Sequence, residues 1–276
     1  MKTVAIAGVG LIGGSFALAL RQAGFPGVIA GVSSPRTIAE ALEHRIIDRE
    51  MTLAEAAREA DVLLLAQPIG RIIALIEEMA PYLGPQTLVT DAGSTKSAIC
   101  AAAARYLPAE QFLGGHPMAG KESRGAASAD GGLFRGRTWV LTRESSHPFV
   151  EWVRKIGAHI LTLGPEEHDR TVALTSHLPQ LLATALGCTV GTGLTRDEQL
   201  RAGGPGLIDM TRLALSPYDM WNDILTTNAE HVDAAIGALV DRLQSMRGRL
   251  RDGALRPDFE EGASLRRKLV QPVQLR

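Results

Sequence analysis

Residues 3–13 read TVAIAGVGLIG, an apolar run followed by three glycines in a GxGxxG pattern and by the start of an amphipathic segment. The run Thr3–Gly8 has the composition of a buried strand, and apolar residues recur at helical spacing over Leu11–Ala23. The glycines therefore lie between a strand and a helix. This context predicts the first βα turn of a nucleotide-binding α/β sheet.

Each glycine of this turn has its own physical task. Gly8 permits the tight turn, Gly10 lets the backbone approach a pyrophosphate, and Gly13 lets the helix pack against the strand. The first N–H groups of the helix, at Leu11 and Ile12, would then face the phosphates. We predict that a dinucleotide binds here. The alternative is a structural turn in an unrelated α/β protein.

The first part of the chain continues to alternate strands and helices. Further strands are expected at Val28–Val32, Val62–Ala66, Thr87–Thr90, Gln111–Gly115, Thr138–Thr142 and His159–Leu163. Helices are expected between them, among others at Ile69–Ala80, Thr95–Arg105 and Pro148–Ile156. This alternation implies βαβ crossovers. We therefore expect a Rossmann-type, doubly wound parallel sheet in residues 1–164.

The pattern changes at Gly164–Pro165. Beyond it only helical stretches are expected, at Glu166–Thr175, Leu181–Thr192, Tyr218–Thr226 and Ala229–Arg251, followed by a short polar extension. Residues 165–276 are thus predicted to form an all-helical domain. This domain is too small to bury all its apolar faces alone, so we expect a homodimer formed through it.

Composition narrows the possible partners. The chain has 276 residues, of which 45% are hydrophobic and 21% charged, with a formal net charge of −1. The chain has no net positive charge that would attract nucleic acid, and no apolar run reaches the roughly 18 residues of a membrane span. The first strand starts at once, leaving no room for a signal peptide. We expect a cytoplasmic protein without nucleic-acid, membrane or metal partners.

The end of the second predicted strand bears on the choice of dinucleotide. An acidic residue there would bind the ribose 2′-hydroxyl of NAD, but this chain has Ser33, Ser34 and Arg36. Hydroxyls and a guanidinium suit a 2′-phosphate, which favours NADP over NAD. Alternatively, Ser34 simply caps the next helix.

Polar or glycine-rich loops follow five of the predicted strands. The carboxyl ends of parallel strands lie along one edge of a sheet, where ligands bind. The loops are Gly8–Gly13, Ser33–Arg36, Gln67–Pro68, Asp91–Lys96 and His116–Gly120. We expect them to converge on one crevice, with Gln67, Pro68 and Asp91 near the cofactor.

Two side chains in these loops are candidate catalytic groups. Ser94 precedes a predicted helix, so its hydroxyl either caps that helix or faces the crevice. His116 is held in a stiff turn bracketed by glycines. Because histidine titrates near neutral pH, it can take a hydroxyl proton as a hydride leaves the same carbon.

The helical domain adds candidates for substrate binding. The segment Thr175–Gln180 is predicted to end one helix and begin another, which places His177 at a helix boundary or in a capping role. Arg212 lies among apolar residues, where its guanidinium could clamp a substrate carboxylate. The alternative for Arg212 is an ion pair with Asp209 or Asp219.

The combination of these motifs resembles the prephenate/arogenate dehydrogenases of tyrosine biosynthesis. The matching segments are Gly8–Gly13, Asp91–Lys96, Gly115–Gly120, Ser176–Pro179 and Asp209–Arg212. The resemblance extends through about residue 250, and its HPMxG and SHLP motifs are far more specific than the glycine turn. It implies oxidative decarboxylation of a cyclohexadienol by NAD(P), and a dimer through the helical domain.

The resemblance also implies roles for individual residues. His116 would be the general base, and Ser94 would hydrogen-bond the C4 hydroxyl. Arg212 would hold the ring carboxylate, with His177 supporting the substrate end of the pocket. Some members carry His at the position of Gln180 and Lys or Arg at that of Ile208. Prephenate and arogenate therefore both stay open as substrates.

Three other functions fit the sequence less well. A β-hydroxyacid dehydrogenase would use a lysine, but none occurs between Ile156 and Arg267. An imine reductase of this architecture would leave His116 and His177 without purpose. A catalytically silent dinucleotide sensor would need a partner-binding element, and the sequence offers none.

Overall fold

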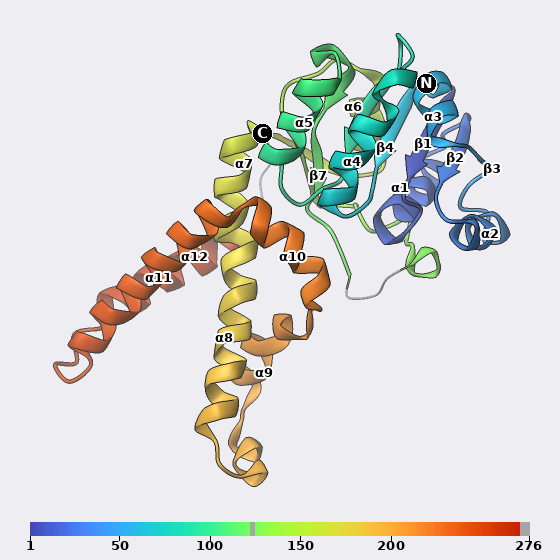
Figure 1. Ribbon diagram of the computed structural model, residues 1–276. Coiled ribbons are helices and arrows are strands. Elements are labelled where there is room, and N and C mark those ends of the chain that lie inside the picture. The colour runs from blue at the N-terminus through green and yellow to red at the C-terminus, as the bar shows by residue number, and fades with distance from the viewer. Residues whose placement is uncertain (122–124, 271–276) are drawn as a thin grey trace.

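The computed structural model describes residues 1–121 and 125–270, with an α/β part from which long helices project (Figure 1). Six parallel strands form the main sheet in the order β3-β2-β1-β4-β5-β6. They are β1 (Thr3–Ala7), β2 (Val28–Val32), β3 (Arg49–Glu50), β4 (Val62–Leu65), β5 (Leu88–Asp91) and β6 (Phe112–Leu113). The strand order reverses between β1 and β4, which confirms the predicted doubly wound sheet.

Helices cover both faces of this sheet. They are α1 (Leu11–Gln22), α2 (Pro35–Glu43), α3 (Leu53–Glu59), α4 (Ile69–Met79), α5 (Ser97–Tyr106) and α6 (Pro148–Lys155), with short turns η1 (Ala80–Tyr82), η2 (Ala109–Gln111) and η3 (Ala126–Ser128). Along β1, Val4 and Ile6 enter a core with α1 and α6, whereas Ala5 and Ala7 enter a second core with α3, α4 and α5. Burial on both faces explains why these strands read as continuous apolar runs.

The last three strands form a separate sheet, which the sequence did not predict. In it β7 (Gly115–Pro117) pairs antiparallel with β8 (Thr138–Leu141), which pairs parallel with β9 (His159–Thr162). The single expected strand Gln111–Gly115 was wrong, because the chain divides at Gly114 into β6 and β7. Strand β3 was also missed, since two residues are too few to show a period.

A buried ion pair ties the two sheets together. The ammonium of Lys96 contacts the Asp91 carboxylate at the end of β5, and both side chains are fully buried. Lys96 Nζ also donates to the carbonyl of Gly115 at 2.8 Å, while Asp91 Oδ1 accepts from the Gly115 N–H at 3.0 Å. Asp91 and Lys96 thus fix the start of β7 to the edge of the main sheet.

The rest of the described chain is helical. It comprises α7 (Pro165–Val172), η4 (Ala173–His177), α8 (Leu178–Gly193), η5 (Asp197–Ala202), α9 (Pro205–Thr211), η6 (Arg212–Leu215), α10 (Tyr218–Thr227), α11 (Ala229–Arg249) and α12 (Arg256–Val270). The polar extension expected after residue 251 forms α12, whose Asp258 pairs with Arg242 and Arg249 of α11. No helix in residues 1–121 and 125–270 is long and apolar enough to cross a membrane.

Helices α7 and α8 form one continuous rod (Figure 1). The expected break at Thr175–Gln180 was wrong, because η4 is a π-helical turn that joins the two helices without interruption. Pro179 lies near the start of α8, directly after the π-turn. A π-turn inserts an extra residue into the helix and so shifts which side chains share a face.

The ion pair leads to a prediction about stability. Lys96→Met should lower the free energy of unfolding by about 3–5 kcal/mol, because it leaves the buried Asp91 carboxylate without its cation. Urea denaturation would measure the loss. The matched control is Lys121→Met, which breaks an exposed pair with Asp130 and should leave stability nearly unchanged. A Lys96→Met protein as stable as the control would contradict the proposed tie between the sheets.

Candidate active site

A cleft of about 530 Å³ lies at the carboxyl edge of the main sheet. Its walls come from the loops after β1, β4 and β5, from residues 119–121, and from α10 of the helical part. The residues predicted from the sequence that line it are Leu11, Ile12, Gln67, Pro68 and Ser94. This volume is typical of a small-molecule site, and the loops converge there as the topology required.

The geometry of the glycine turn fits an anionic group. Gly8 has φ +103°, and a Cβ added there would lie 2.3 Å from the carbonyl oxygen of Ala66. A Cβ on Gly13 would lie 2.1 Å from the carbonyl oxygen of Gly8. At Gly10, by contrast, nothing lies within 4 Å, and the first turn of α1 has no side-chain cap. The turn therefore combines open space at Gly10 with backbone donors, as a dinucleotide phosphate requires.

The loop after β2 shows a capped helix. Ser34 accepts a hydrogen bond from the Thr37 N–H at 3.4 Å, and Pro35 begins α2. The capping interpretation of Ser34 is thus confirmed. Arg36 lies exposed in the first turn of α2, and neither Ser33 nor Arg36 lines the cleft beside the glycine turn.

Two expectations about the loop after β5 need correction. Asp91 does not face the cleft, because its buried carboxylate is taken up by Lys96 and by the N–H groups of Gly93 and Gly115. Ser94 does not cap a helix, because α5 begins only at Ser97. The Ser94 side chain instead belongs to the lining of the cleft.

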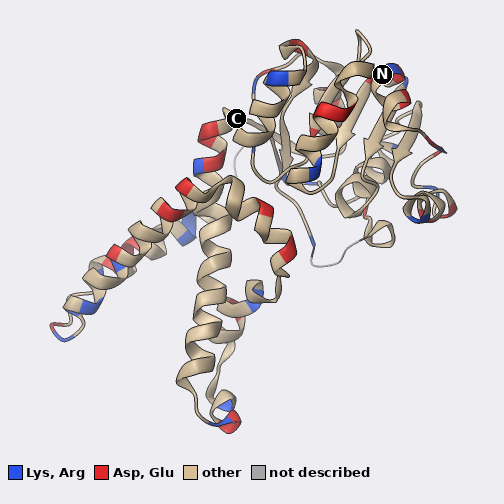
Figure 2. Cartoon of the chain, viewed as in Figure 1, with Lys and Arg blue, Asp and Glu red and all other residues tan. Residues whose placement is uncertain are grey.

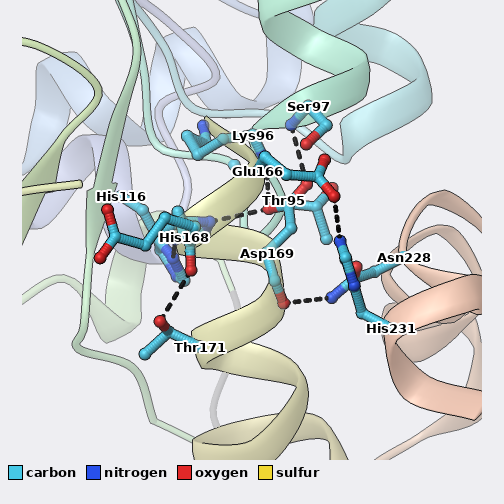
Figure 3. Close-up of polar contacts among 12 residues, drawn as sticks. Thr95, Lys96, Ser97, His116, Glu166, His168, Asp169, Thr171, Asn228 and His231 are labelled. Carbon is cyan, nitrogen blue, oxygen red and sulfur yellow. Dashed lines mark hydrogen bonds and ion pairs between the residues drawn. The ribbon is translucent and has the colours of Figure 1, made fainter. Parts of the chain in front are cut away.

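His116 lies in β7 rather than in the expected stiff turn, opposite Val140 of β8. Its Nδ1 is 2.8 Å from Nε2 of His168 on α7, and the two rings meet edge to face at 66° (Figure 3). Burial and the nearby His168, Lys96 and His177 side chains hold the pKa of His116 well below its usual value, against a smaller opposing effect of Asp169. His116 is therefore neutral near pH 7 and can accept a proton.

The partners of His116, His168 and Asp169, were not predicted from the sequence. His168 Nδ1 is 2.8 Å from Oδ1 of Asp169, and both side chains are buried. Asp169 also accepts from the N–H groups of Lys96 at 2.7 Å and Ser97 at 2.8 Å, where α5 begins (Figure 3). Burial alone would raise the pKa of Asp169, but the hydrogen bonds from His168, Ser97 and Lys96 outweigh it and bring the pKa to about 2.

A second buried histidine, His177, is held by the start of α11. The amide nitrogen of Asn228 lies 3.2 Å from His177 Nδ1 and donates to the backbone oxygen of Asp169 at 2.8 Å. Trp221 of α10 packs against the His177 ring at 5.9 Å. Burial lowers the pKa of His177 to about 4. Since Asn228 donates to Nδ1, the neutral ring carries its proton on Nε2.

Gln180 and Arg212 lie further along the rod. Gln180 is buried and donates its amide N–H to the carbonyl of Leu213 at 2.8 Å, which joins α8 to η6. Arg212 is the first residue of η6 and is exposed. Neither residue lines the cleft that contains Ser94.

The chain is similar to known prephenate dehydrogenases over nearly its whole length. Residues 16–164 match the nucleotide-binding domain of prephenate dehydrogenase, and residues 164–263 match its dimerization domain. Prephenate dehydrogenase of Lactococcus lactis is 34% identical over 98% of this chain and 78% of its own length. That of Bacillus subtilis is 33% identical over 83% of this chain, which spans 65% of the relative. Cyclohexadienyl dehydrogenase of Zymomonas mobilis is 30% identical over 89% of this chain and 87% of its own length.

Solved structures agree with these relatives. Prephenate dehydrogenase from Aquifex aeolicus, in complex with hydroxyphenyl propionate and NAD+, superimposes with a TM-score of 0.88 at 29% identity, covering 98% of this chain and 99% of that one. Synechocystis arogenate dehydrogenase gives a TM-score of 0.83 at 27% identity, covering 98% and 100%. The sheet topology, the glycine turn and these matches over nearly the whole chain show that the protein belongs to the prephenate dehydrogenase family.

Proposed function

We propose that the chain is a prephenate dehydrogenase, which converts prephenate to 4-hydroxyphenylpyruvate and CO₂ with NAD(P)+ in tyrosine biosynthesis. The observation that carries this proposal is the half-buried, neutral His116 and its bond to His168. Through Gly115 and Asp91 it is fixed to the loop whose Ser94 lines the cleft. A neutral imidazole next to that loop is suited to accept the hydroxyl proton of a substrate that gives up a hydride.

The proposed roles divide between the two parts of the chain. His116 Nε2 takes the proton of the C4 hydroxyl, and Ser94 orients that hydroxyl. Arg212 binds the ring carboxylate, while His177 and Gln180 support the substrate end of the pocket; these three assignments rest on the resemblance in sequence. When bound, the nicotinamide accepts the hydride from C4. Loss of the carboxylate as CO₂ then makes the ring aromatic, which drives the reaction.

Arogenate is the second candidate substrate. It carries an ammonium group where prephenate has a keto group, and Asp219 and Asp223 of α10 bring negative charge to the cleft. One of them, Asp223, is partly engaged, because it accepts the Gly70 N–H at the start of α4 at 3.0 Å. The other functions, a different reductase or a silent sensor, would leave the His116 arrangement unused.

The proposal predicts turnover by the wild-type protein. We expect prephenate to reduce NAD+ or NADP+ with release of CO₂, measured as the rise in nicotinamide absorbance. Both substrates should be tested with both cofactors. Faster turnover of arogenate would reverse the substrate assignment, and no turnover in any of the four combinations would overturn the function.

His116 and Arg212 should affect different kinetic constants. His116→Asn should lower kcat by roughly 10²–10⁴-fold with KM nearly kept, because the proton acceptor is lost. Arg212→Ala should mainly raise the KM for the substrate, because a charge-assisted contact to the carboxylate is lost. Steady-state kinetics on both variants measures the split. An unchanged KM in Arg212→Ala would remove Arg212 from the substrate pocket.

For the cofactor, we propose that NADP+ is preferred over NAD+. Support comes from the position of Ser33 and Arg36 directly after β2, where the adenosine ribose lies in such folds. No acidic side chain occurs in residues 31–37 to repel a 2′-phosphate. Arg36 is exposed and can reach outward from the first turn of α2.

Substituting this arginine tests the preference. Arg36→Ala should raise the KM for NADP+ roughly 10–100-fold, the equivalent of a charged hydrogen bond of about 1.5–3 kcal/mol. The KM for NAD+ should not change, since NAD+ lacks the 2′-phosphate, and it serves as the internal control. Equal effects on both cofactors, or a wild-type preference for NAD+, would contradict the proposal.

We also propose that a cytoplasmic homodimer forms through the helical domain. Helix α8 has no charged residue over its 16 positions, and its ribbon is tan throughout in Figure 2. Large apolar side chains are exposed on α11 and α12, among them Leu243, Phe259, Leu265 and Leu269. A monomer that exposed such a surface to water would associate, and a second copy is the partner the domain match supports.

A further inference from the structure

The structure contains a chain of three hydrogen-bonded side chains, His116–His168–Asp169, that runs from β7 into α7 (Figure 3). Only its first member has a role in the proposed function. The other two are buried, come from the helical part of the chain, and lie 52 and 53 positions away from His116 in sequence.

We propose that His168, itself oriented by Asp169, is a positioning residue that fixes His116 in the tautomer whose Nε2 can accept a proton. This inference rests on the proposed function of His116 as a base. It assigns to His168 a task that neither the sequence motifs nor the family match specifies.

The direction of each hydrogen bond follows from Asp169. Its carboxylate is ionised and can only accept, and it already accepts from the N–H groups of Lys96 and Ser97. In its neutral form, His168 therefore donates its Nδ1–H to Asp169, which leaves its Nε2 as an acceptor. His116 must then donate its Nδ1–H to His168 Nε2, which leaves the lone pair of His116 on Nε2.

Without this chain His116 would have no fixed tautomer. Its ring would be free to carry the proton on Nε2, and in that form the nitrogen offered to the substrate is a donor and cannot act as a base. The buried position of His168 allows no water to replace it easily, since its side chain has no exposed surface. Within the described residues, the His168 side chain makes no hydrogen bonds other than those to His116 and Asp169. A substitution at His168 therefore tests this chain specifically.

The proton step balances with this arrangement. The substrate O–H bond breaks as its proton goes to His116 Nε2, and the electron pair forms the C4 carbonyl. The C4–H bond breaks at the same time, and its hydrogen leaves with both electrons to the nicotinamide. His116 is then an imidazolium, whose Nδ1–H still donates to His168. The Asp169 carboxylate behind His168 stabilises the positive charge along the chain.

The first test reads the tautomers directly and needs no turnover. Full-length protein labelled with ¹⁵N at its seven histidines would be studied by long-range ¹H–¹⁵N NMR at neutral pH. We expect His116 and His168 both to carry their proton on Nδ1, with signals assigned through His116→Asn and His168→Gln. A wild-type His116 with its proton on Nε2, or a doubly protonated His168, would overturn the proposal.

The second test compares two substitutions of His168. His168→Leu removes the acceptor and should lower kcat by about 10²-fold or more, close to the loss of a general base, with little change in KM. His168→Gln retains an amide oxygen that can accept from His116 and should keep more of kcat. Thermal unfolding controls for folding of both variants. Equal losses in the two, or full kcat in His168→Leu, would contradict the positioning role.

The third test is the pH profile of kcat/KM. The groups that face His116 are His168 and Asp169 of α7, Lys96 before α5 and His177 of η4; of these only Asp169 favours the protonated ring. Asp169→Asn removes that negative charge and so lowers the pKa of His116 further. Because the neutral base is the active form, the acid limb should move to lower pH while kcat falls. An acid limb at the same pH as in the wild type would contradict the proposed hydrogen-bonded chain His116–His168–Asp169.

These outcomes are separable from failure of the proposed function. If wild-type protein turns over neither prephenate nor arogenate, the function is wrong, whatever the NMR spectra show. If it is active but the tautomers or the His168 variants behave otherwise than expected, the function stands and the positioning role falls.

Discussion

The Asp169 carboxylate is where the two parts of this protein meet. It lies near the start of the helical rod, yet it accepts the N–H groups of Lys96 and Ser97 at the beginning of α5 in the α/β part. A negative charge at a helix N-terminus is favourable because it meets the positive end of the helix dipole and satisfies otherwise unpaired donors. The same carboxylate orients His168, and Asn228 of the α10–α11 junction donates to its backbone oxygen. One buried anion therefore sets the position of the helical part relative to the loop that carries Ser94.

The buried charges near this site, Asp91, Lys96 and Asp169, are all compensated by nearby partners. Asp91 is neutralised by Lys96 on one side of the α5 start, and Asp169 is held by hydrogen-bond donors on the other. With those charges compensated, His116 and His177 stay neutral, since burial lowers the pKa of both imidazoles. The two histidines also have opposite hydrogen-bonding roles. The chain from Asp169 leaves His116 Nε2 as an acceptor, whereas Asn228 leaves His177 Nε2 as a donor. A proton acceptor and a hydrogen-bond donor are thus made from the same residue type by their partners alone.

The sequence predicted the parts of this arrangement that depend on local pattern. The glycine turn, the parallel sheet and the convergence of Gln67 and Ser94 on one cleft follow from periodicity and topology, which act over short distances. The His168–Asp169 pair could not be found in this way. It lies in the run Glu166–Asp169 at the start of a helix, which has the composition of a solvated first turn. Only tertiary contacts, of His168 with β7 and of Asp169 with the start of α5, distinguish them from their exposed neighbours Glu166 and Glu167.

The π-turn explains why the histidines of the rod could not be placed from helical spacing either. His168 and His177 are nine positions apart, and at about 100° per residue an ideal α-helix would put them on opposite faces. The η4 turn takes up an extra residue between them, and both side chains are buried, with Asn228 holding the Asp169 backbone and the His177 ring at once. A regular helix would bury one histidine and expose the other. The irregular turn overlaps the segment Thr175–Gln180, where the sequence predicted a break. It lets a single continuous rod supply both a partner for His116 and the donor His177.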